Sequence, residues 1–378
     1  MKKKKLLFVI PEYSHGGTNK NLESLLHFLD KEKYDLSIIS LYEDGGDYYK
    51  NIFAPYIYKK SILYHLLHDN LVTRKFLGLY HKINKKANFD WLYKNEAKRL
   101  NKMKYDIAIA FQEGTATEFV SYMTECKKIA WVQCDYGVFL VRSKYPKSHI
   151  YIGFDKIVCV SKAAATSMCK HTTGIQNKIV SIYNPIVTQT IKESATLNVT
   201  DLIHEEDFNI ISVGRIDPIK QFDYIPSILN TAKDLLKKNV NWYIIGAGSG
   251  EHKEKIKNEI AKYELQGSII LVEAKDNPYP YIKNANLYVC TSLSESFSYS
   301  IFESKILHTP VVSNNFPVAQ EVVEKDCGWI CSLEEMPDLL VKIINDEGGI
   351  YTKMKESISS YEYSNDDIIK EIEKILDN

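Results

Sequence analysis

A glycine and two cations come directly after an apolar run in the second half of the chain. They are Gly214, Arg215 and Lys220. Glycine lets a backbone approach a bound molecule closely, because it has no side chain. Arginine can contact two phosphate oxygens at once, and lysine adds a compact positive charge. These residues predict a site that stabilises a departing diphosphate, although a turn with two surface cations would have the same composition.

Two carboxylates, Glu295 and Glu303, lie eight positions apart further along the chain. A helix is expected to start between them. The first amides of a helix have no partner within it, so those from Ser298 to Ser300 would suit a phosphate. Carboxylates on both sides of such a site can accept hydrogen bonds from sugar and ribose hydroxyls. The alternative is an acidic residue that complements the helix dipole, followed by a solvated helix glutamate.

Short apolar runs alternate with helical stretches in both halves, as they do in α/β proteins with buried parallel strands. Residues 48–104 have a mostly helical pattern without a clear strand, and Ser161 is expected to cap the helix that follows it. Two such series predict two open parallel sheets, whose ligands bind beyond the carboxyl ends of the strands. The expected strands are 6–10, 36–41, 107–111, 129–132, 157–160, 179–182, 210–213, 242–245, 269–272, 287–290 and 310–313.

The chain is expected to form two domains, because its 378 residues exceed one ordinary core. The first domain is predicted over 1–187, a polar linker over 188–207 and the second domain over 208–365. A last helix over 366–378 carries an apolar stripe. The natural place for a ligand of such a chain is the cleft between its domains.

Charge is unevenly distributed, although the net charge of the whole chain is zero. Residues 1–190 contain 29 of the 48 Lys and Arg but only 17 of the 48 Asp and Glu. The rest of the chain contains 19 Lys and Arg and 31 Asp and Glu. The basic half predicts contact with an anionic ligand or with an anionic membrane surface, and an ordinary solvated surface is the alternative. No nucleic acid is expected as a partner, because the cations are spread out and no reader motif occurs.

The sequence has no pattern for a metal site, a disulfide framework or a membrane span. Its seven cysteines form no Cys-x-x-Cys pair, its ten histidines lack zinc-ligand spacing, and no Asp-x-Asp occurs. Gly246-x-Gly248-x-Gly250 lacks the spacing of a dinucleotide loop, so no NAD is expected. Pro11 ends the first apolar run too early for a signal peptide, and no run approaches the ~20 residues of a span. We expect a cytoplasmic protein without metal or cofactor.

In their order and spacing, the glycine, the two cations and the two carboxylates of the second half resemble the motifs of the large retaining glycosyltransferase family four. The resemblance extends over nearly the whole chain, is strong over 208–325 and is weak over 42–104. It implies an α/β chain of the GT-B fold, with two Rossmann-like domains and a donor cleft between them. The shared motifs are Gly214-Arg215, Lys220, Glu295-x7-Glu303 and Pro310-Val311-Val312, with further matches at 11–17, 158–162, 182–185, 246–248 and 284–286.

The resemblance also implies roles for single residues. Arg215, Lys220 and Glu295 would be catalytic: the two cations would bind the donor diphosphate, and the carboxylate would face the donor sugar. Glu303 would hold the ribose hydroxyls, and the helix over 366–378 would cross back onto the first domain. The other donor-binding residues that it implies are Gly16, Gly17, Gly214, Ala274, Lys275, Phe297, Ser298, Tyr299 and Ser300.

The implied reaction is a metal-independent transfer with retention of configuration. An acceptor hydroxyl attacks the anomeric carbon from the side on which the nucleoside diphosphate departs, and the leaving phosphate oxygen takes its proton. The expected donor is a UDP-sugar rather than GDP-mannose. The expected acceptor is a glycan or a lipid-linked oligosaccharide of a bacterial surface polysaccharide. The protein would then be cytoplasmic, or peripheral on the inner face of the membrane.

Two departures from the family pattern concern specificity. The family usually has Gly-Phe-Gly or Gly-Phe-Pro after the first glutamate, and this chain has Ser296-Phe297-Ser298. Near the acceptor, related enzymes often have His in a Trp-x-His-x-Asp segment, where this chain has Gln133. Glutamine cannot act as a base, so Asp135 or Glu113 would have to substitute for it unless both are structural. These three residues are the acceptor-side candidates.

Two other functions remain open at this stage. One is a nucleotide-sugar epimerase or a phosphorylase on the same fold; a phosphorylase needs a pyridoxal lysine site and a longer chain, and an epimerase needs no acceptor. The other is a non-catalytic partner subunit that binds sugar nucleotides for another transferase. The presence of Arg215, Lys220, Glu295 and Glu303 argues against the partner subunit, whereas Gln133 argues for it.

Overall fold

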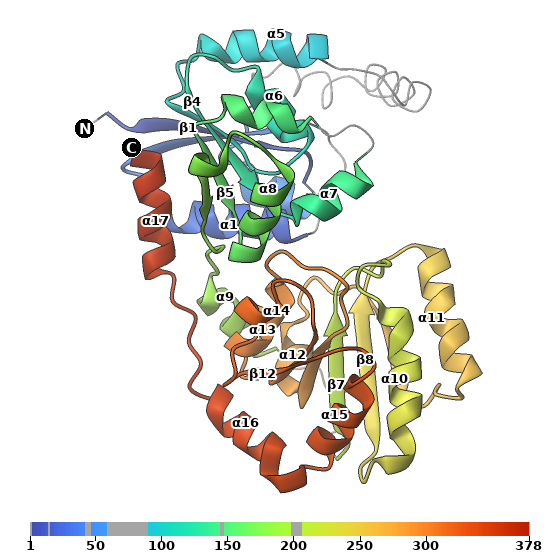
Figure 1. Cartoon of the computed structure of the whole chain (residues 1–378). Coiled ribbons are helices and arrows are strands. Elements are labelled where there is room, and N and C mark those ends of the chain that lie inside the picture. The colour runs from blue at the N-terminus through green and yellow to red at the C-terminus, as the bar shows by residue number, and fades with distance from the viewer. Residues whose placement is uncertain are drawn as a thin grey trace. The chain divides into compact units, whose positions relative to one another are not determined.

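The computed structural model describes residues 2–13, 16–41, 47–58, 90–143, 147–197 and 206–377. The chain divides into two compact units, each built around a parallel six-stranded sheet (Figure 1). The first unit is Met1–Ile186 with Asn365–Asn378, and the second is Val187–Ser364. The predicted α/β architecture with two parallel sheets is confirmed.

The strands of the first sheet lie in the order β2-β1-β3-β4-β5-β6. Phe8 of β1 lies opposite Ile38 of β2 and Ile109 of β3, and all three side chains are fully buried. Burial on both faces explains why these strands are nearly continuous apolar runs in the sequence. The strands are β1 (Lys4–Ile10), β2 (Tyr34–Ser40), β3 (Ile107–Ala110), β4 (Lys127–Val132), β5 (Lys156–Cys159) and β6 (Ile179–Ser181).

Seven α-helices lie in the described part of the first unit. Two of them begin at side-chain caps: oxygens of Asp135 and Ser161 accept hydrogen bonds from the amides of Val138 and Ala164. The cap predicted at Ser161 is therefore present. The helices are α1 (Gly17–Phe28), α2 (Asp47–Phe53), α5 (Asp90–Asn101), α6 (Thr115–Ser121), α7 (Tyr136–Arg142), α8 (Lys162–His171) and α17 (Asp366–Asp377), with short 3-10 turns at Ser148–Gly153 and Gln176–Lys178.

The last helix, α17, packs on the first unit, although the residues that precede it belong to the second (Figure 1). Lys4 Nζ donates to Leu376 O at 2.7 Å, and Lys127 Nζ donates to Ile375 O at 3.0 Å. These cations also complement the negative end of the helix dipole. Ile372 and Leu376, one turn apart, are each 1% exposed. The apolar stripe of this helix is thus part of the first unit's core.

The strands of the second sheet lie in the order β12-β11-β10-β7-β8-β9. Trp242 of β8 lies opposite Ile210 of β7 and Ile269 of the edge strand β9. Trp242 and Ile210 are fully buried, so the centre of the sheet is again apolar on both faces. The strands are β7 (Phe208–Val213), β8 (Val240–Gly246), β9 (Ile269–Glu273), β10 (Leu287–Cys290), β11 (Val311–Asn314) and β12 (Gly328–Cys331).

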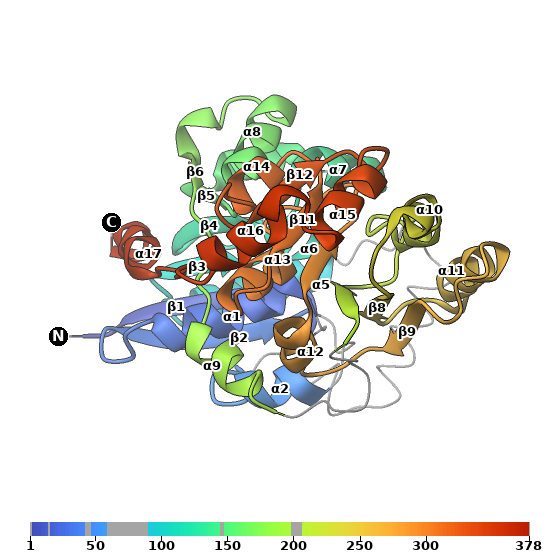
Figure 2. The same cartoon turned by 90° about the horizontal axis from the view of Figure 1, so that it is seen from below.

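Helices lie on both faces of the second sheet, with α10 on one face and α12 on the other (Figure 2). The helices are α9 (Thr188–Ser194), α10 (Ile225–Ala232), α11 (Gly250–Lys262), α12 (Tyr279–Asn284), α13 (Tyr299–Ile306), α14 (Ala319–Val322), α15 (Met336–Ile344) and α16 (Ile350–Ile358), with 3-10 turns at Phe222–Tyr224, Lys233–Leu235 and Glu347–Gly349. Among the described residues of either unit, no helix has both the length and the apolar character of a membrane span.

The predicted linker over 188–207 is wrong in its first part, because α9 begins there. Ile191 and Ala195, four positions apart, are buried in the second unit. One such pair is too short a periodic signal to stand out in a polar segment. Residues 198–205 of the predicted linker, and residues 59–89 of the block 48–104, lie outside the described residues.

Candidate functional site

The order of the strands in the second sheet reverses between β7 and β10. The chain continues from β7 to β8 and β9 on one side, and β10, β11 and β12 lie on the other. The loops that follow these two neighbouring strands therefore diverge, and such an opening is where open α/β sheets bind ligands. Arg215 and Lys220 stand in the loop after β7, and Glu295 stands in the loop after β10.

Lys220 and Glu295 form an ion pair in this opening. Lys220 Nζ lies 2.5 Å from Glu295 Oε1, and the two side chains are 16% and 13% exposed. Burial is the largest single effect and acts to lower the pKa of Lys220, but Glu295 together with Cys290 and Asp217 outweighs it, so the pKa is raised. Ser292 Oγ donates to the same Glu295 oxygen at 2.7 Å. Two predicted catalytic residues that are 75 positions apart thus stand together.

Arg215 forms an ion pair of its own, separate from the Lys220–Glu295 pair. Its side chain is 68% exposed and pairs with Asp217, with 3.3 Å between Nη2 and Oδ2. An exposed pair of this kind contributes little to stability. The guanidinium can therefore exchange Asp217 for an anionic ligand at small cost, which suits its predicted role on a diphosphate.

Glu303 lies inside α13 and is 2% exposed. Tyr279 OH, at the start of α12, donates to Glu303 Oε1 at 3.3 Å. The alternative of a solvated helix glutamate is therefore wrong for this residue. A buried carboxylate keeps its geometry, because its neighbours restrict the side chain, and it can receive hydroxyl groups in a fixed direction.

The start of α13 has an unusual backbone at Ser298, whose φ is 61°. This left-handed conformation favours glycine, so serine is held there by its surroundings. The Ser298 hydroxyl is buried and has no hydrogen-bond partner among the described residues. Phe297, 3% exposed, stacks on Phe302 with 4.5 Å between ring centroids and so anchors the turn. The turn that begins this helix is thus built tightly, and Tyr299 and Ser300 follow as its first two residues.

Close backbone packing explains two of the three glycines that imitate a dinucleotide loop, Gly246 and Gly248. A Cβ added to Gly246 would stand 1.9 Å from Gly214 O, and one added to Gly248 would stand 2.4 Å from Ile216 O. The loop after β7 therefore lies directly on the end of β8. Lys220 Cε in turn lies 3.0 Å from the Cβ position of Gly214, so this glycine makes room for the lysine stem.

Ala274 and Lys275, predicted near the base, directly follow the edge strand β9, and both are exposed. Lys275 Nζ lies 6.0 Å from the centre of the Tyr281 ring. This contact does not join them to the Lys220–Glu295 pair. Their assignment therefore remains a prediction.

The predicted glycine loop of the first unit leads into α1. Gly17 is the first residue of that helix, and Gly16 precedes it with extended backbone at φ 175° and ψ 172°. A Cβ at Gly16 would meet nothing within 4 Å. The first amides of a helix lack internal partners and can bind an anion, and the assignment of Gly16 and Gly17 to the donor remains a prediction.

A polar cluster joins three of the strand ends in the first unit. Glu113 Oε2, after β3, accepts a hydrogen bond from Gln133 N, after β4, at 2.8 Å. Asn21 Nδ2, on α1, donates to Gln133 Oε1 at 3.3 Å and to Asn184 Oδ1 at 2.6 Å. Burial raises the pKa of Glu113 above its ordinary value of 4.5. The structure thus brings two of the three acceptor-side candidates together.

Sequence reasoning missed Asn21 and Asn184 as members of this cluster. The only signal for Asn21 is a polar side chain one turn after the Gly16-Gly17 pair, whereas Asn184 lies before Pro185 in the matched segment 182–185. The third candidate, Asp135, has a structural role, because its Oδ1 accepts hydrogen bonds from Val138 N at 3.0 Å and Ser167 Oγ at 2.8 Å. It caps α7 and so has less freedom to act as a base.

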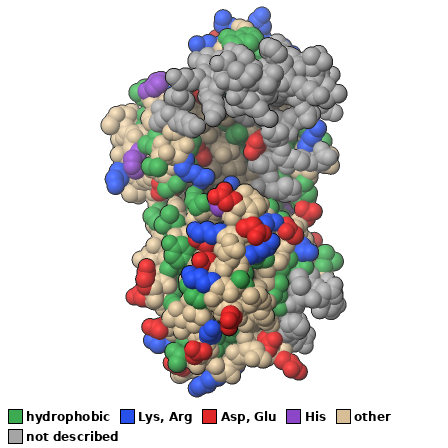
Figure 3. Space-filling view, turned by 90° about the vertical axis from the view of Figure 1, so that its right-hand side faces the viewer, with side chains coloured by type: hydrophobic (Ala, Val, Ile, Leu, Met, Phe, Trp, Pro, Cys, Tyr) green, Lys and Arg blue, Asp and Glu red, His purple; other side chains and the backbone are tan. Residues whose placement is uncertain are grey.

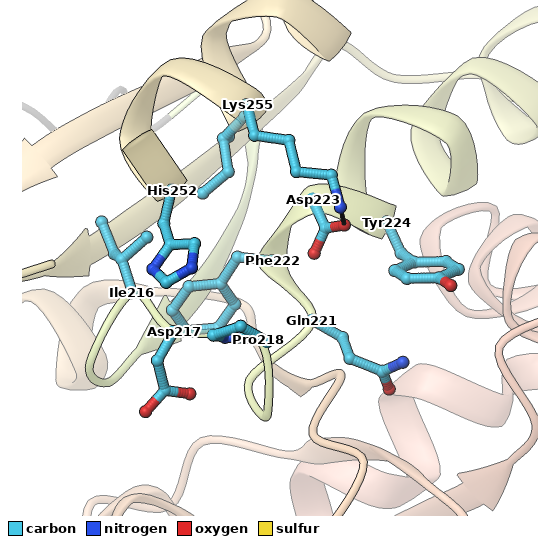
Figure 4. A pocket seen from close by; sticks show the side chains of 10 residues that line it. Ile216, Asp217, Pro218, Gln221, Phe222, Asp223, Tyr224, His252 and Lys255 are labelled. Atoms are coloured by element: carbon cyan, nitrogen blue, oxygen red, sulfur yellow. Dashed lines mark ion pairs between the residues drawn. The ribbon is translucent and has the colours of Figure 1, made fainter. Parts of the chain in front are cut away.

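A pocket of about 200 Å³ opens beside the loop after β7 (Figure 4). It is lined by residues 216–218 and 221–224 and by the first turns of α11, where Lys255 Nζ lies 2.6 Å from Asp223 Oδ2. Its lining contains two carboxylates, Asp217 and Asp223, and one lysine, so its charge does not favour a diphosphate. Elsewhere in the described residues, as here, no group of three His, Cys, Asp or Glu side chains has a metal-binding arrangement.

Comparison with known proteins finds a family model that matches the part of the chain that carries these motifs. Residues 197–377 match the family model described as Glycosyl transferases group 1. This range contains Gly214, Arg215, Lys220, Glu295 and Glu303. An uncharacterized glycosyltransferase of Haemophilus influenzae is 27% identical over 390 residues, which cover 98% of each chain.

Two further relatives match about half of the chain. The O-antigen biosynthesis glycosyltransferase WclY of Escherichia coli is 25% identical over 182 residues, 47% of this chain and 48% of that one. A Campylobacter jejuni enzyme, N-acetylgalactosamine-N,N'-diacetylbacillosaminyl-diphospho-undecaprenol 4-alpha-N-acetylgalactosaminyltransferase, is 25% identical over 217 residues, 56% and 55% of the two chains.

Among solved structures, Anabaena Alr3699/HepE in complex with UDP and glucose superposes with a TM-score of 0.73. The match covers 99% of both chains at 13% sequence identity. This likeness shows that the two proteins share a fold.

Proposed function

We propose that this chain, a group 1 glycosyltransferase with the GT-B fold, transfers the sugar of a UDP-sugar to a hydroxyl group of a glycan or lipid-linked acceptor. The reaction would belong to the synthesis of a bacterial surface polysaccharide. The observation that carries the proposal is the opening between β7 and β10. It holds the half-buried Lys220–Glu295 pair, and the helix with the buried Glu303 starts from the same loop. Cations, carboxylates and helix amides at one strand switch suit a sugar diphosphate.

In the proposed reaction, the bond between the anomeric carbon and the phosphate oxygen breaks while the acceptor oxygen bonds to that carbon from the same side. The phosphate oxygen takes the acceptor proton. Arg215, Lys220 and the first amides of α13 stabilise the leaving diphosphate. The diphosphate draws Lys220 from Glu295, whose carboxylate then accepts hydroxyls of the donor sugar. No metal takes part, so EDTA should leave the rate unchanged, and the product should keep the donor's anomeric configuration by NMR.

The proposal of UDP and of a lipid-linked acceptor draws on two of the similar proteins. Anabaena Alr3699/HepE has been solved with UDP and glucose. The name of the Campylobacter relative gives a diphospho-undecaprenol-linked sugar as its acceptor. An acceptor of that kind stays at a membrane, so an enzyme that uses it must work at the membrane surface.

Residues 136–178 of the first unit support such a peripheral location. They contain seven Lys and Arg but one carboxylate, Asp155. On α7, Val141 is 88% exposed beside the exposed Arg142. Anionic head groups attract cations of this kind, and an exposed valine adds apolar contact. By contrast, acidic and basic side chains are mixed on the face of the second unit seen in Figure 3.

Vesicle binding tests this location. Wild type should sediment with phosphatidylglycerol vesicles and not with phosphatidylcholine vesicles, and Val141→Asp should weaken the binding. Leu235→Asp, at a residue 61% exposed in the second unit, is the matched control and should bind like wild type. If wild type ignores anionic vesicles at moderate salt, the peripheral location is wrong.

The first test of the donor site is a thermal-shift screen with UDP, GDP, ADP and dTDP and their common sugars. Wild type should be stabilised by UDP and UDP-sugars, because a ligand that binds only the folded state raises its stability. Arg215→Ala and Glu303→Ala should lose the shift. A wild type that responds to no nucleotide would instead favour the non-catalytic partner subunit, which Gln133 in place of histidine keeps in view.

A further inference from the structure

Tyr288 contacts both of the segments that are proposed to bind the donor diphosphate. It lies on β10 and is 2% exposed. Its hydroxyl oxygen is 2.7 Å from Ser300 Oγ and 3.4 Å from Val213 O. Val213 ends β7 and directly precedes Gly214, whereas Ser300 is the second residue of α13. A single buried side chain thus joins the loop with the cations to the start of the helix.

The chemistry of the three groups fixes the direction of these hydrogen bonds. A carbonyl oxygen can only accept, so the proton of Tyr288 points to Val213 O when both bonds are formed, and Ser300 donates to the tyrosine oxygen. Burial raises the pKa of Tyr288 well above its ordinary value, so the hydroxyl keeps the proton that this arrangement needs.

Other hydrogen bonds hold the loop after β7 against the loop after β10. Thr291 Oγ1 donates to Lys220 O at 2.7 Å, and Leu293 N donates to Ile219 O at 2.7 Å. Neither of these bonds reaches α13. Tyr288 extends this connection from the loops to the helix.

We propose that Tyr288 is a positioning residue, which through Ser300 holds the start of α13 and the Gly214 loop at the separation that a diphosphate requires. The inference rests on the proposed function, because it concerns the same donor site. Groups that are already fixed in place bind an anion more strongly, since binding then requires no rearrangement. Tyr288 acts through its neighbours and does not itself touch the donor.

Tyr288→Phe tests the proposal, because it removes the hydroxyl and keeps the shape of the ring. We expect the Kd for UDP to rise about fivefold, the effect of one lost hydrogen bond. The Kd for UMP should change much less, because UMP lacks the second phosphate that bridges the two segments. With a UDP-sugar, KM should rise more than kcat falls. A change that was merely structural would weaken UDP and UMP alike.

Tyr351→Phe is the matched control. Tyr351 OH donates to Asn286 O at 3.2 Å in the same unit, away from the proposed site. This variant should lose similar stability and bind UDP like wild type. Ser300→Ala keeps the backbone amide and should reproduce the loss of Tyr288→Phe. The double variant should be no weaker than either single one, since both remove the same bond.

The outcomes separate the two proposals. A wild type that does not bind UDP rejects the proposed function itself. A wild type that binds UDP, with Tyr288→Phe at the same affinity or with equal losses for UDP and UMP, overturns the positioning role alone. Should Tyr288→Phe fail to fold, Ser300→Ala decides by the same comparison.

Discussion

The Lys220–Glu295 pair shows how a candidate binding site is kept ready without its ligand. Each charge is largely removed from water, and each is compensated by the other at 2.5 Å. A buried pair is a weak source of net stability, but removing one partner leaves an uncompensated charge. The pair therefore keeps a cation and a carboxylate together in the opening without a ligand.

A double-mutant cycle measures this coupling. Lys220→Met should destabilise the chain by about 3 kcal/mol, because Glu295 stays buried without its cation. The double variant Lys220→Met/Glu295→Gln should be more stable than the sum of the single changes predicts. Urea unfolding of the four proteins gives the numbers. Additive effects would mean that the ion pair does not exist in solution.

Glu113 should make the stability of the first unit depend on pH. Its pKa in the folded protein is raised above 4.5 by burial, so between these two values the folded state binds more protons than the unfolded state. The stability is fully present below about pH 4.5 and is lost as the pH rises through the folded pKa. In Glu113→Gln this loss should disappear. Melting temperatures of both proteins from about pH 4 to about pH 8 test it; parallel curves would contradict the raised pKa.

At the scale of the elements, the end of β8 determines where the loop after β7 lies. Gly246 and Gly248 allow the backbone of that loop to approach to distances that no Cβ would permit. The same contact holds Gly214 and Lys220 at the carboxyl end of the sheet. Gly246 and Gly248 thus serve the fold of the proposed donor site rather than a dinucleotide of their own.

Gly246→Ala should displace this loop, because its Cβ would stand 1.9 Å from a backbone oxygen that has little room to move. We expect a destabilisation of about 1–3 kcal/mol and a clear loss of UDP binding. Gly250→Ala is the matched control: it begins α11, and its Cβ would meet nothing within 4 Å. Thermal denaturation and UDP titration of both variants check the prediction. Unchanged UDP affinity in Gly246→Ala would contradict it.

At the scale of the whole molecule, the first unit is made from two separate parts of the chain. The backbone N–H and C=O of Ile186 pair with the side chain of Asn365, both at 2.9 Å, where the chain leaves and re-enters this unit. α17 then adds buried apolar side chains to a sheet formed long before it in the sequence. The second unit contains all of the predicted donor-binding residues from Gly214 to Glu303.

Deletion of residues 365–378 should therefore affect the two units differently. The melting temperature of the first unit should fall, because Ile372 and Leu376 leave its core. UDP should still raise the melting temperature of the second unit. Calorimetry with and without UDP follows both transitions. Ile372→Ala should also lower the melting temperature of the first unit, whereas Lys370→Ala, at an exposed position, should leave it unchanged. An unchanged first transition after the deletion would contradict the role of α17.

Much of the fold could be predicted from the sequence, because burial of a strand is a local property. Eleven of the twelve strands were expected near their observed places, since an apolar run such as 6–10 records its own burial. β12 is missing from that set because four residues with a glycine and a half-buried tryptophan make no clear run. The order of Gly214, Lys220, Glu295 and Glu303 also stands in the sequence and indicates sugar-nucleotide chemistry.

Only the tertiary structure decided which of these residues meet. Lys220 pairs with Glu295 across 75 positions, Tyr288 reaches two segments, and Asn21 contacts Gln133 across 112 positions. Periodicity reports that a residue is buried but not what it is buried against, because a partner far along the chain leaves no local pattern. Residue types and their order are thus properties of the sequence. The ion pair, the buried Glu303 and the close approach at Gly246 exist because the sheet brings distant loops to one edge.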